Sequence, residues 1–449
     1  MCKLNQIGWS AVLLAALAVP FAHSLEKEPG SVYHARRVAL ATKLHGGVAV
    51  LFAAEEPLLD FMPYRQDEDF YYLTGRDEPG AALMVVGASG APGPSRAYKE
   101  ILFLPTRNLR MEKYIGPKLD AASPGVSAAT GVDAVEPMTD LPVELNKLMA
   151  DDRELTRKVW VQPASEQAKA LVTFNAATLG MDSAPAPHDV TRLTMLLRQV
   201  KDPGEVALLK KAADASIIGQ RVMMKAMHPG ETERTVAGKM MAAWLQAGCE
   251  RPSYAPIVGS GINSTILHYD ENSRTIRDGD IVVVDAACEY SMYASDITRT
   301  VPANGHFTPR QREIYNVVLG SQQAAIKAFV AGKSTIDDPY RHDPNSLDTV
   351  AYNYINTHGK GPHGEPLGKY WIHGLGHMVG IDVHDPADYP AVLKPGMVFT
   401  IEPGVYIPEE KLGVRFECTF LVGADGKLID LTAALPHTAD EVEAAMIGK

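Results

Sequence analysis

Two aspartates stand on adjoining stretches of sequence that have the apolar and β-branched character of strands. In DIVVVDAACEYSMYASDITRT, residues 280–300, Asp285 ends an apolar run and Asp296 precedes a second β-rich run. We interpret this stretch as a β-hairpin whose turn falls at Tyr290 and Ser291, midway between the aspartates, so that the two carboxylates face each other. Facing carboxylates repel and destabilise a strand pair. A positive charge should therefore lie between them.

A second stretch repeats this arrangement with glutamates. VFTIEPGVYIPEEKLGVRFECTFLV, residues 398–422, carries Glu402 on one arm and Glu417 on the other, with the midpoint at Glu409 and Glu410 in a polar turn. Two hairpins of this kind supply four carboxylates, and hard divalent cations require such oxygen-rich surroundings. The pair of hairpins therefore predicts a metal site.

Three histidines follow one another within WIHGLGHMVGIDVHDP, residues 371–386: His373, His377 and His384. The intervening glycines argue against a helix, so the stretch is not the H-x-x-x-H ligand pair of the zincins. One of these histidines can complete an oxygen-dominated metal site while the others face the substrate.

Two further residues are candidates because of their neighbours. A lone histidine after an apolar run, such as His268 in PIVGSGINSTILHYDEN, is more often structural than catalytic. Its position just before the acidic hairpin favours a functional role. Arg415 lies two residues before Glu417 and therefore on the same strand face, where it could anchor a ligand carboxylate or the substrate.

This set of side chains indicates hydrolysis. Two divalent cations bridged by carboxylates lie about 3.5–4 Å apart in such sites and can hold a hydroxide between them as the nucleophile for an amide, ester or phosphoester. Four carboxylates and one imidazole are too hard for a structural zinc site, and they favour Mn²⁺, with Co²⁺ or Zn²⁺ as alternatives. A surface Ca²⁺ site, the other interpretation, would need neither inward hairpins nor nearby histidines.

The composition sets the wider frame. The chain of 449 residues is long enough for two domains with a substantial core, and its 46% hydrophobic and 22% charged residues are typical of globular proteins. The formal net charge of −11 argues against nucleic acid and anionic membranes as partners.

Residues 1–24 resemble a secretory signal peptide. Lys3 is their one charge, an apolar run extends from Ala11 to Ala22, and Ala22-His23-Ser24 fits the small-x-small rule before a cleavage site. The run is too short to span a bilayer as an uncleaved anchor, and no later segment approaches that length. We therefore expect an exported, soluble mature protein, periplasmic in a Gram-negative source.

Removal of the leader leaves the cysteines Cys249, Cys288 and Cys418. An odd number at wide spacings does not predict a disulfide framework. Cys288 and Cys418 lie close in sequence to proposed metal ligands, but we expect both to be buried thiols of a packed core.

The remaining pattern divides the chain into two domains. Residues 25–180 interleave helical patterns with candidate strands at VAVLFAA, DFYYLTG, AALMVVG, ILFLP and VWVQ, which predicts an α/β domain. It contains no cluster of ligands and no nucleotide-binding glycine pattern, so its role should be structural or substrate-gating. A linker is predicted at 181–190 and the catalytic domain at 191–449.

A helix should open the catalytic domain, with Asp202 as N-cap and Pro203 in its first turn. Arg198, Lys201 and Glu205 stand near this helix start, and charge pairing there explains them at least as well as a function does. Further helices are expected over 231–248 and 308–332. The polar segment 333–370 carries three histidines that should lie at the surface: His342, His358 and His363.

Several of these stretches, in their order along the chain, resemble those of a known family: ILHYDEN, VVVDAACEY, SDITRT, HGLGHMVGIDVHD, TIEPGVYI and GVRFE. The chain is similar to the Xaa-Pro aminopeptidases (aminopeptidase P), of the metallopeptidase family that includes prolidase and methionine aminopeptidase. YRQDEDFYYLTGRDEPGAALMVV is similar to the N-terminal domain that aminopeptidase P and prolidase carry. The resemblance implies an α+β fold: a C-terminal pita-bread domain of two pseudo-symmetric halves, preceded by a smaller α/β domain of the creatinase/prolidase type.

The resemblance also implies roles for individual residues. The dinuclear metal ligands would be Asp285, Asp296, His377, Glu402 and Glu417. His268 and His384 would flank the substrate and stabilise the tetrahedral intermediate, while Glu402 would also shuttle a proton to the departing nitrogen. His373 would lie behind the ligands, His373 and Tyr406 would contribute to substrate binding, and Arg415 would orient Glu417.

The implied reaction is hydrolysis of the bond between an N-terminal residue and a proline at position two, which ordinary aminopeptidases handle poorly. Three alternatives remain open: prolidase, which accepts only dipeptides; a non-catalytic peptide-binding module; and a phosphoesterase. The filled ligand positions argue against the second, and the lack of an Arg/Lys cluster near the ligands argues against the third. Similar enzymes are often dimers or tetramers, so a homo-oligomer is expected.

Overall fold

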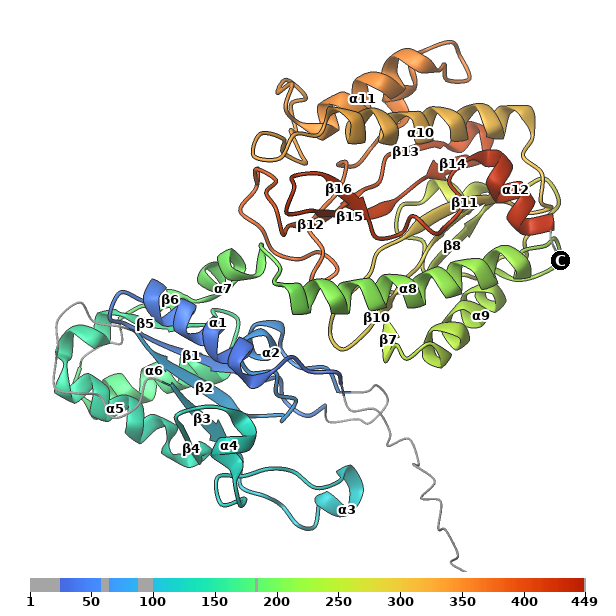
Figure 1. The fold of residues 1–449 in the computed structure, drawn as a ribbon. Coiled ribbons are helices and arrows are strands. Elements are labelled where there is room, and N and C mark those ends of the chain that lie inside the picture. The colour runs from blue at the N-terminus through green and yellow to red at the C-terminus, as the bar shows by residue number, and fades with distance from the viewer. Residues whose placement is uncertain (1–24, 58–63, 88–99, 182–184, 448–449) are drawn as a thin grey trace, which may run out of the picture.

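The computed structural model describes residues 25–57, 64–87, 100–181 and 185–447. The predicted signal peptide, residues 1–24, lies outside the described residues. An N-terminal α/β domain and a larger C-terminal domain are connected through α7 (Thr191–Arg198), which lies between them in Figure 1.

The N-terminal domain contains one six-stranded sheet in the order β4-β3-β2-β1-β5-β6. Its strands are β1 (Val48–Phe52), β2 (Ala82–Val86), β3 (Glu100–Leu104), β4 (Ala134–Pro137), β5 (Val159–Val161) and β6 (His188–Asp189). Its helices are α1 (Gly30–Lys43), α2 (Glu68–Thr74), α3 (Glu112–Ile115), α4 (Val126–Thr130), α5 (Leu141–Asp151) and α6 (Glu166–Thr178). The central strands are buried on both faces, which explains their nearly continuous apolar sequences.

Two sequence predictions for this domain need correction. DFYYLTG is helix α2, not a strand: Asp67 accepts a hydrogen bond from the Phe70 N–H as N-cap, and Gly75 ends the helix with φ of 61°. Because nearly every side chain of α2 is buried, its sequence shows no helical period. The sheet also reaches into the predicted linker 181–190, because β6 is its edge strand.

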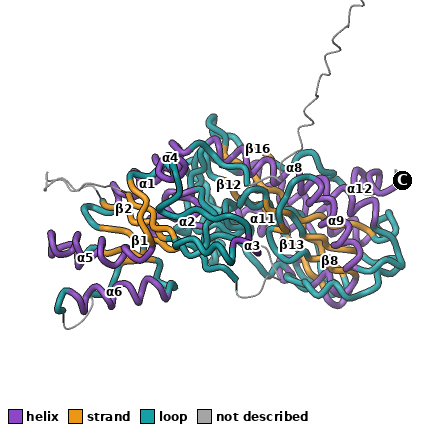
Figure 2. The backbone as a smooth tube through the Cα atoms, turned by 90° about the horizontal axis from the view of Figure 1, so that it is seen from below, coloured by secondary structure: helices purple, strands orange, loops and turns teal. Residues whose placement is uncertain are grey.

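The C-terminal domain encloses its strands between two helix pairs (Figure 1), and Figure 2 shows its strands β8 (Ile257–Ser260) and β13 (Gly404–Ile407) well apart from β1 and β2 of the N-terminal sheet. The first pair is α8 (Pro203–Ala226) and α9 (Glu233–Gln246), and the second is α10 (Pro309–Ala328) and α11 (Leu347–His358). Asp202 and Glu205 form a capping box at the start of α8, where a helix start is predicted. A short helix, α12 (Ala439–Ile447), ends the described chain.

The strands of this domain form small sheets, one set in each half. β8 (Ile257–Ser260), β9 (Ile281–Asp285) and β11 (Thr298–Pro302) form one sheet, beside the two-stranded pair β7 (Arg251–Pro252) and β10 (Cys288–Glu289). The other half contains β12 (Val398–Ile401), β13 (Gly404–Ile407), β14 (Leu412–Arg415), β15 (Cys418–Val422) and β16 (Leu428–Asp430). Each half thus combines a helix pair with one of the acidic hairpins. Within the described residues, no helix has both the length and the apolar character that crossing a bilayer needs.

Candidate active site

The first acidic hairpin forms, but with a different register from the one predicted. Asp285 at the end of β9 pairs with Thr298 at the start of β11, so Asp285 and Asp296 do not face each other. The turn is centred on Ser291 and Met292, whose φ angles are 49° and 73°. Asp296 precedes Thr298 by two positions and so shares its face, which makes Asp296 a diagonal neighbour of Asp285. The two carboxylates therefore still converge.

In the second hairpin the two glutamates do occupy opposed positions. β12 pairs with β15 through Ile401 and Cys418, and β13 pairs with β14 through Gly404 and Arg415. Glu402 and Glu417 fall at the break between these two ladders. Neither residue lies within a strand.

Threonine side chains join the two hairpins. The Thr298 hydroxyl donates to Oε2 of Glu417 at 2.7 Å, and the Glu417 N–H donates to the Thr298 carbonyl at 3.2 Å. The Thr419 hydroxyl donates to the carbonyl of Asp296 at 2.7 Å. As a result, one ligand oxygen from each of Asp285, Asp296 and Glu417 lies within 4.8 Å of the others.

His377 completes the cluster. Its Nδ1 lies 3.0 Å from the carbonyl oxygen of Met378, to which an Nδ1–H donates, while Nε2 lies 3.3 Å from both Oδ2 of Asp296 and Oε1 of Glu402. Burial disfavours the charged imidazole, but the two carboxylates outweigh it and raise the pKa of His377 to about 9. The structure thus places all five predicted ligands around one point.

Arg415 is buried and brings one positive charge to the carboxylates, beside Asp285. Its guanidinium donates to Oδ2 of Asp285 at 2.5 Å, to the Tyr406 hydroxyl at 2.9 Å and to the Thr298 hydroxyl at 3.2 Å. Arg415 therefore contacts Asp285 directly and reaches Glu417 only through Thr298. Its implied role of orienting Glu417 would be exerted through that hydroxyl.

Tyr254 belongs to this cluster, and the sequence did not indicate it. Its hydroxyl lies 2.5 Å from Oδ1 of Asp285 and 2.7 Å from Oδ1 of Asp296. The residue stands in CERPSYAP, 31 positions before Asp285, and none of the predicted ligand or substrate-binding residues lies in that stretch. The pairing of β8 with β9, in which Ile257 lies opposite Asp285, brings it to the carboxylates.

The donor set fits a pair of divalent cations. Oε1 of Glu417 is buried and has no hydrogen-bond partner among the described residues. Burial raises the pKa of Glu402 to about 7 and also raises the pKa values of Asp285 and Glu417, to which the neighbouring carboxylates add. Only Arg415 and one histidine thus offset the negative charge of four carboxylates. Bound divalent cations would supply further positive charge and stabilise the ionised carboxylates.

The cluster lines a cavity of about 490 Å³, and the remaining predicted histidines lie around it. The side chains of His268 and His384 are exposed to this cavity, and the rings of His384 and His377 are 4.0 Å apart between centroids. Nε2 of His373 lies 2.9 Å from the hydroxyl of Tyr406. Burial lowers the pKa of His373 to about 4, which keeps its imidazole neutral at neutral pH. The catalytic and substrate-binding roles of these residues stay predictions.

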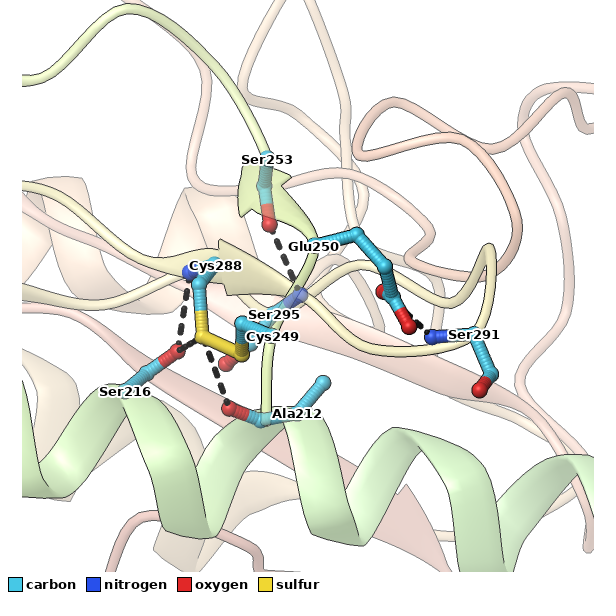
Figure 3. Close-up of a disulfide and its surroundings, with 8 residues drawn as sticks. All are labelled: Ala212, Ser216, Cys249, Glu250, Ser253, Cys288, Ser291 and Ser295. Carbon is cyan, nitrogen blue, oxygen red and sulfur yellow. Dashed lines mark hydrogen bonds between the residues drawn. A yellow bond between two sulfur atoms is a disulfide. The ribbon is translucent and has the colours of Figure 1, made fainter. Parts of the chain in front are cut away.

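The cysteine prediction is wrong for two of the three residues. Cys249, after the end of α9, forms a disulfide with Cys288 of β10, which lies over α8 beside Ser216 (Figure 3). The Cys288 N–H donates to the Ser216 hydroxyl at 2.9 Å. The partners are 39 residues apart, and the pairing of β7 with β10, in which Pro252 lies opposite Cys288, brings them together. Cys418 is a buried free thiol, as predicted.

Three of the predicted histidines lie apart from the cavity. His342, His358 and His363 are exposed, as predicted from their polar surroundings. The three charged residues near the start of α8 have different contacts. Glu205 is part of the capping box of α8, whereas Arg198 and Lys201 bind Asp385, next to His384.

Comparison with known proteins gives two matches that together span most of the chain. Residues 207–424 match metallopeptidase family M24, and residues 33–160 match the aminopeptidase P N-terminal domain. The Xaa-Pro aminopeptidase of Escherichia coli strain K12 is 32% identical over 450 residues, covering 92% of this chain and 97% of that protein.

Solved structures of aminopeptidase P are also similar to this chain over most of its length. Proline aminopeptidase P II from Yersinia pestis superposes with a TM-score of 0.82 at 31% identity, covering 93% of this chain and 99% of that one. A zinc-substituted Escherichia coli aminopeptidase P in complex with product gives a TM-score of 0.80 at 29% identity, covering 94% and 99%. The similarity therefore includes both domains.

Proposed function

The chain belongs to metallopeptidase family M24 and carries the aminopeptidase P N-terminal domain, and we propose that it releases the first residue from peptides whose second residue is proline. The fold is the predicted one, an N-terminal α/β domain followed by a pita-bread catalytic domain. The observation that carries the proposal is the convergence of the five ligand-type side chains in one cavity: Asp285, Asp296, His377, Glu402 and Glu417.

The substrate bond sets the chemical demand. In an Xaa-Pro bond the ring fixes φ and the nitrogen carries no hydrogen, so recognition cannot use an N–H at that position. Hydrolysis then needs an activated water, stabilisation of negative charge on the carbonyl oxygen, and a proton for the departing proline nitrogen.

Asp285, Asp296, His377, Glu402 and Glu417 would hold two divalent cations, for which the carboxylate-rich set favours Mn²⁺. Bound cations would supply a nucleophilic water of lowered pKa and polarise the carbonyl group. His268 and His384 face the same cavity and can donate hydrogen bonds to the developing oxyanion. Glu402, which accepts a hydrogen bond from the Thr400 hydroxyl at 3.1 Å, would carry the proton to the proline nitrogen.

Export is a second part of the proposal. The sequence of residues 1–24 supports a cleaved signal peptide, and the Cys249–Cys288 disulfide is of the kind that persists in oxidising compartments. Expression of the full sequence in a Gram-negative host tests this proposal. The intact mass of the periplasmic protein should equal that of a chain that begins at Leu25. Full-length protein retained in the cytoplasm would contradict it.

We also propose a homo-oligomer. The segment around α3 projects from the N-terminal domain in Figure 1 and exposes four apolar side chains, Leu109, Met111, Tyr114 and Ile115. Exposed apolar side chains grouped in this way are typical of contact surfaces. Light scattering of the mature protein should give a mass of two or four chains, and a monomer would contradict this part of the proposal.

The activity is tested with three short peptides. Mature protein stripped of metal and resupplied with Mn²⁺ should release alanine from Ala-Pro-Ala but not from Ala-Ala-Ala, as followed by mass spectrometry. Cleavage of Ala-Pro alone would identify a dipeptidase instead. No cleavage of any peptide by protein with Mn²⁺ bound would contradict the proposed substrate and leave the metal site in place.

A further inference from the structure

The segment that carries His384 is a short loop with little structure of its own. It leaves the site at His377 and returns through two backbone hydrogen bonds, from the Asp385 N–H to the Met378 carbonyl and from the Gly380 N–H to the Asp382 carbonyl, both 2.9 Å long. The His384 side chain is exposed to the cavity, whereas the next residue, Asp385, is buried. The position of His384 therefore depends on what holds Asp385.

Two buried, positively charged side chains hold Asp385. Arg198 donates through Nη2 to Oδ1 of Asp385 at 2.6 Å, and Lys201 donates through Nζ to Oδ2 at 3.0 Å. The same Nη2 reaches Oδ2 of Asp382 at 2.7 Å. Burial opposes ionisation of Asp385, but the two cations outweigh it and lower its pKa. Both acidic residues flanking His384 are thus fixed by charge-assisted hydrogen bonds.

The N-terminal domain takes part in the same network. Nη1 of Arg198 donates to Oδ1 of Asp69 in α2 at 2.9 Å, and Asp69 is itself buried. A second residue of that domain, Arg65, donates to the Ile381 carbonyl at 2.9 Å and to Oε2 of Glu289 at 2.9 Å. Two side chains from outside the catalytic domain therefore act on the loop that carries His384.

A stabilising role alone does not explain this arrangement. Desolvation of a buried ion pair largely cancels its attraction, and well-packed apolar side chains stabilise a fold at least as well. The charged side chains instead fix the relative positions of the groups they bind, because the planar guanidinium group allows only a narrow range of hydrogen-bond geometry. Arg198 lies at the end of α7, the connection between the domains, where it can hold Asp69 and the loop together.

We propose that Arg198 is a positioning residue, which with Asp69 and Arg65 makes the placement of His384 depend on the docked N-terminal domain. The inference rests on the proposed function, since His384 is taken to contact the substrate. It assigns to the N-terminal domain, which contributes no metal ligand among its described residues, a part in catalysis through this loop.

Asp69→Asn is the variant that tests it. The change keeps the side-chain volume and leaves Arg198 its contacts with Asp382 and Asp385. Asp67→Asn is the matched control, because Asp67 lies at the start of the same helix and caps Phe70 without contacting the loop. Arg65→Gln provides an independent second variant, since it removes the donor to Ile381 and leaves Arg198 intact.

Two measurements distinguish positioning from general stability. Hydrogen–deuterium exchange of a peptide spanning 378–386 should be faster in Asp69→Asn and Arg65→Gln than in wild type or Asp67→Asn. On Ala-Pro-Ala, kcat/KM should fall about tenfold in both test variants, because small misplacements of a reacting group are costly. When His384 is replaced by alanine, the same two changes should lower kcat/KM by less than about twofold. The reason is that they act on catalysis by placing the His384 side chain, which this variant lacks.

An equal loss with and without His384 would overturn the inference, because the network would then act on the fold as a whole. Unchanged exchange and unchanged kinetics in both test variants would overturn it as well. If wild-type protein fails to cleave Ala-Pro-Ala, the proposed function fails, and the exchange comparison still decides whether the N-terminal domain holds the loop.

Discussion

Glu402 and Glu417 face each other at the one break in the second hairpin, between the pair Ile401–Cys418 and the pair Gly404–Arg415. The ladders on both sides fix their backbones, so the two carboxylates cannot move apart without loss of strand pairing. Burial raises the pKa of both groups, and no hydrogen bond from the described residues satisfies Oε1 of Glu417. This is an arrangement that bound cations would complete.

Replacement of one of these carboxylates should abolish metal binding. We expect Glu417→Gln to lower kcat/KM on Ala-Pro-Ala by more than about 100-fold, the upper end for residues that only support a ligand. Added Mn²⁺ should raise the thermal midpoint of wild-type protein but not that of the variant, since binding stabilises only a protein that binds. Elemental analysis after desalting gives the metal content directly.

Glu409→Gln is the control for this experiment, because Glu409 lies exposed in the turn of the same hairpin. Its metal content and activity should equal those of wild type. Full metal occupancy in Glu417→Gln would show that Glu417 is not a ligand.

Tyr254 offers a test of the residue that the sequence did not indicate. Tyr254→Phe removes the hydroxyl shared by Asp285 and Asp296, and we expect metal affinity or kcat/KM to fall about 10–100-fold, as for other groups that orient metal ligands. Tyr315→Phe is the matched control, since that hydroxyl donates to the His437 carbonyl away from the cavity. Wild-type affinity in Tyr254→Phe would mean that Arg415 and the metals suffice to orient the aspartates.

The two hairpins show how far spacing predicts register. For the glutamates the turn is symmetric about Glu409 and Glu410, and Gly404 pairs with Arg415 as the midpoint requires. For the aspartates the turn is centred on Ser291 and Met292, two residues without the glycine or asparagine that usually marks positive φ. The spacing rule therefore placed that turn one residue too early.

Other features depend on contacts that no local pattern carries. The disulfide joins residues 39 apart, and the ion pair of Asp69 with Arg198 spans 129 residues and two domains. The sequence did not predict helix α2 for another reason. Because α2 is buried on nearly all sides, its sequence lacks the amphipathic period by which a helix is recognised. Sequence patterns predicted the ligand types and most elements, whereas these contacts depend on how elements distant in sequence pack within and between the domains.

The disulfide should contribute to stability and not to the chemistry. A cross-link that closes a loop of 39 residues restricts the unfolded chain, and its removal typically costs about 2–4 kcal/mol. The double variant Cys249→Ala, Cys288→Ala should therefore unfold at a thermal midpoint lower by about 2–7 °C. Neither cysteine lines the cavity, so kcat/KM at 25 °C should stay within about threefold of wild type.

Dithiothreitol provides the control for that prediction. It should lower the midpoint of wild-type protein towards that of the double variant and leave the variant unchanged. A midpoint in the double variant equal to that of oxidised wild type would show that the cross-link adds no stability.

Glu205 should make stability depend on pH. The residue is buried beside Arg36, which Glu28 and Asp202 also contact, and burial raises the pKa of Glu205 to about 7. Between the ordinary value of 4.5 and pH 7 the folded protein keeps a proton that the unfolded chain releases, so stability falls as pH rises through this window. Glu205→Gln removes this dependence and keeps an acceptor for the Asp202 N–H. Relative to wild type, the variant should gain about 1–3 kcal/mol between pH 4.5 and pH 8 in urea unfolding, and parallel curves for the two proteins would contradict the prediction.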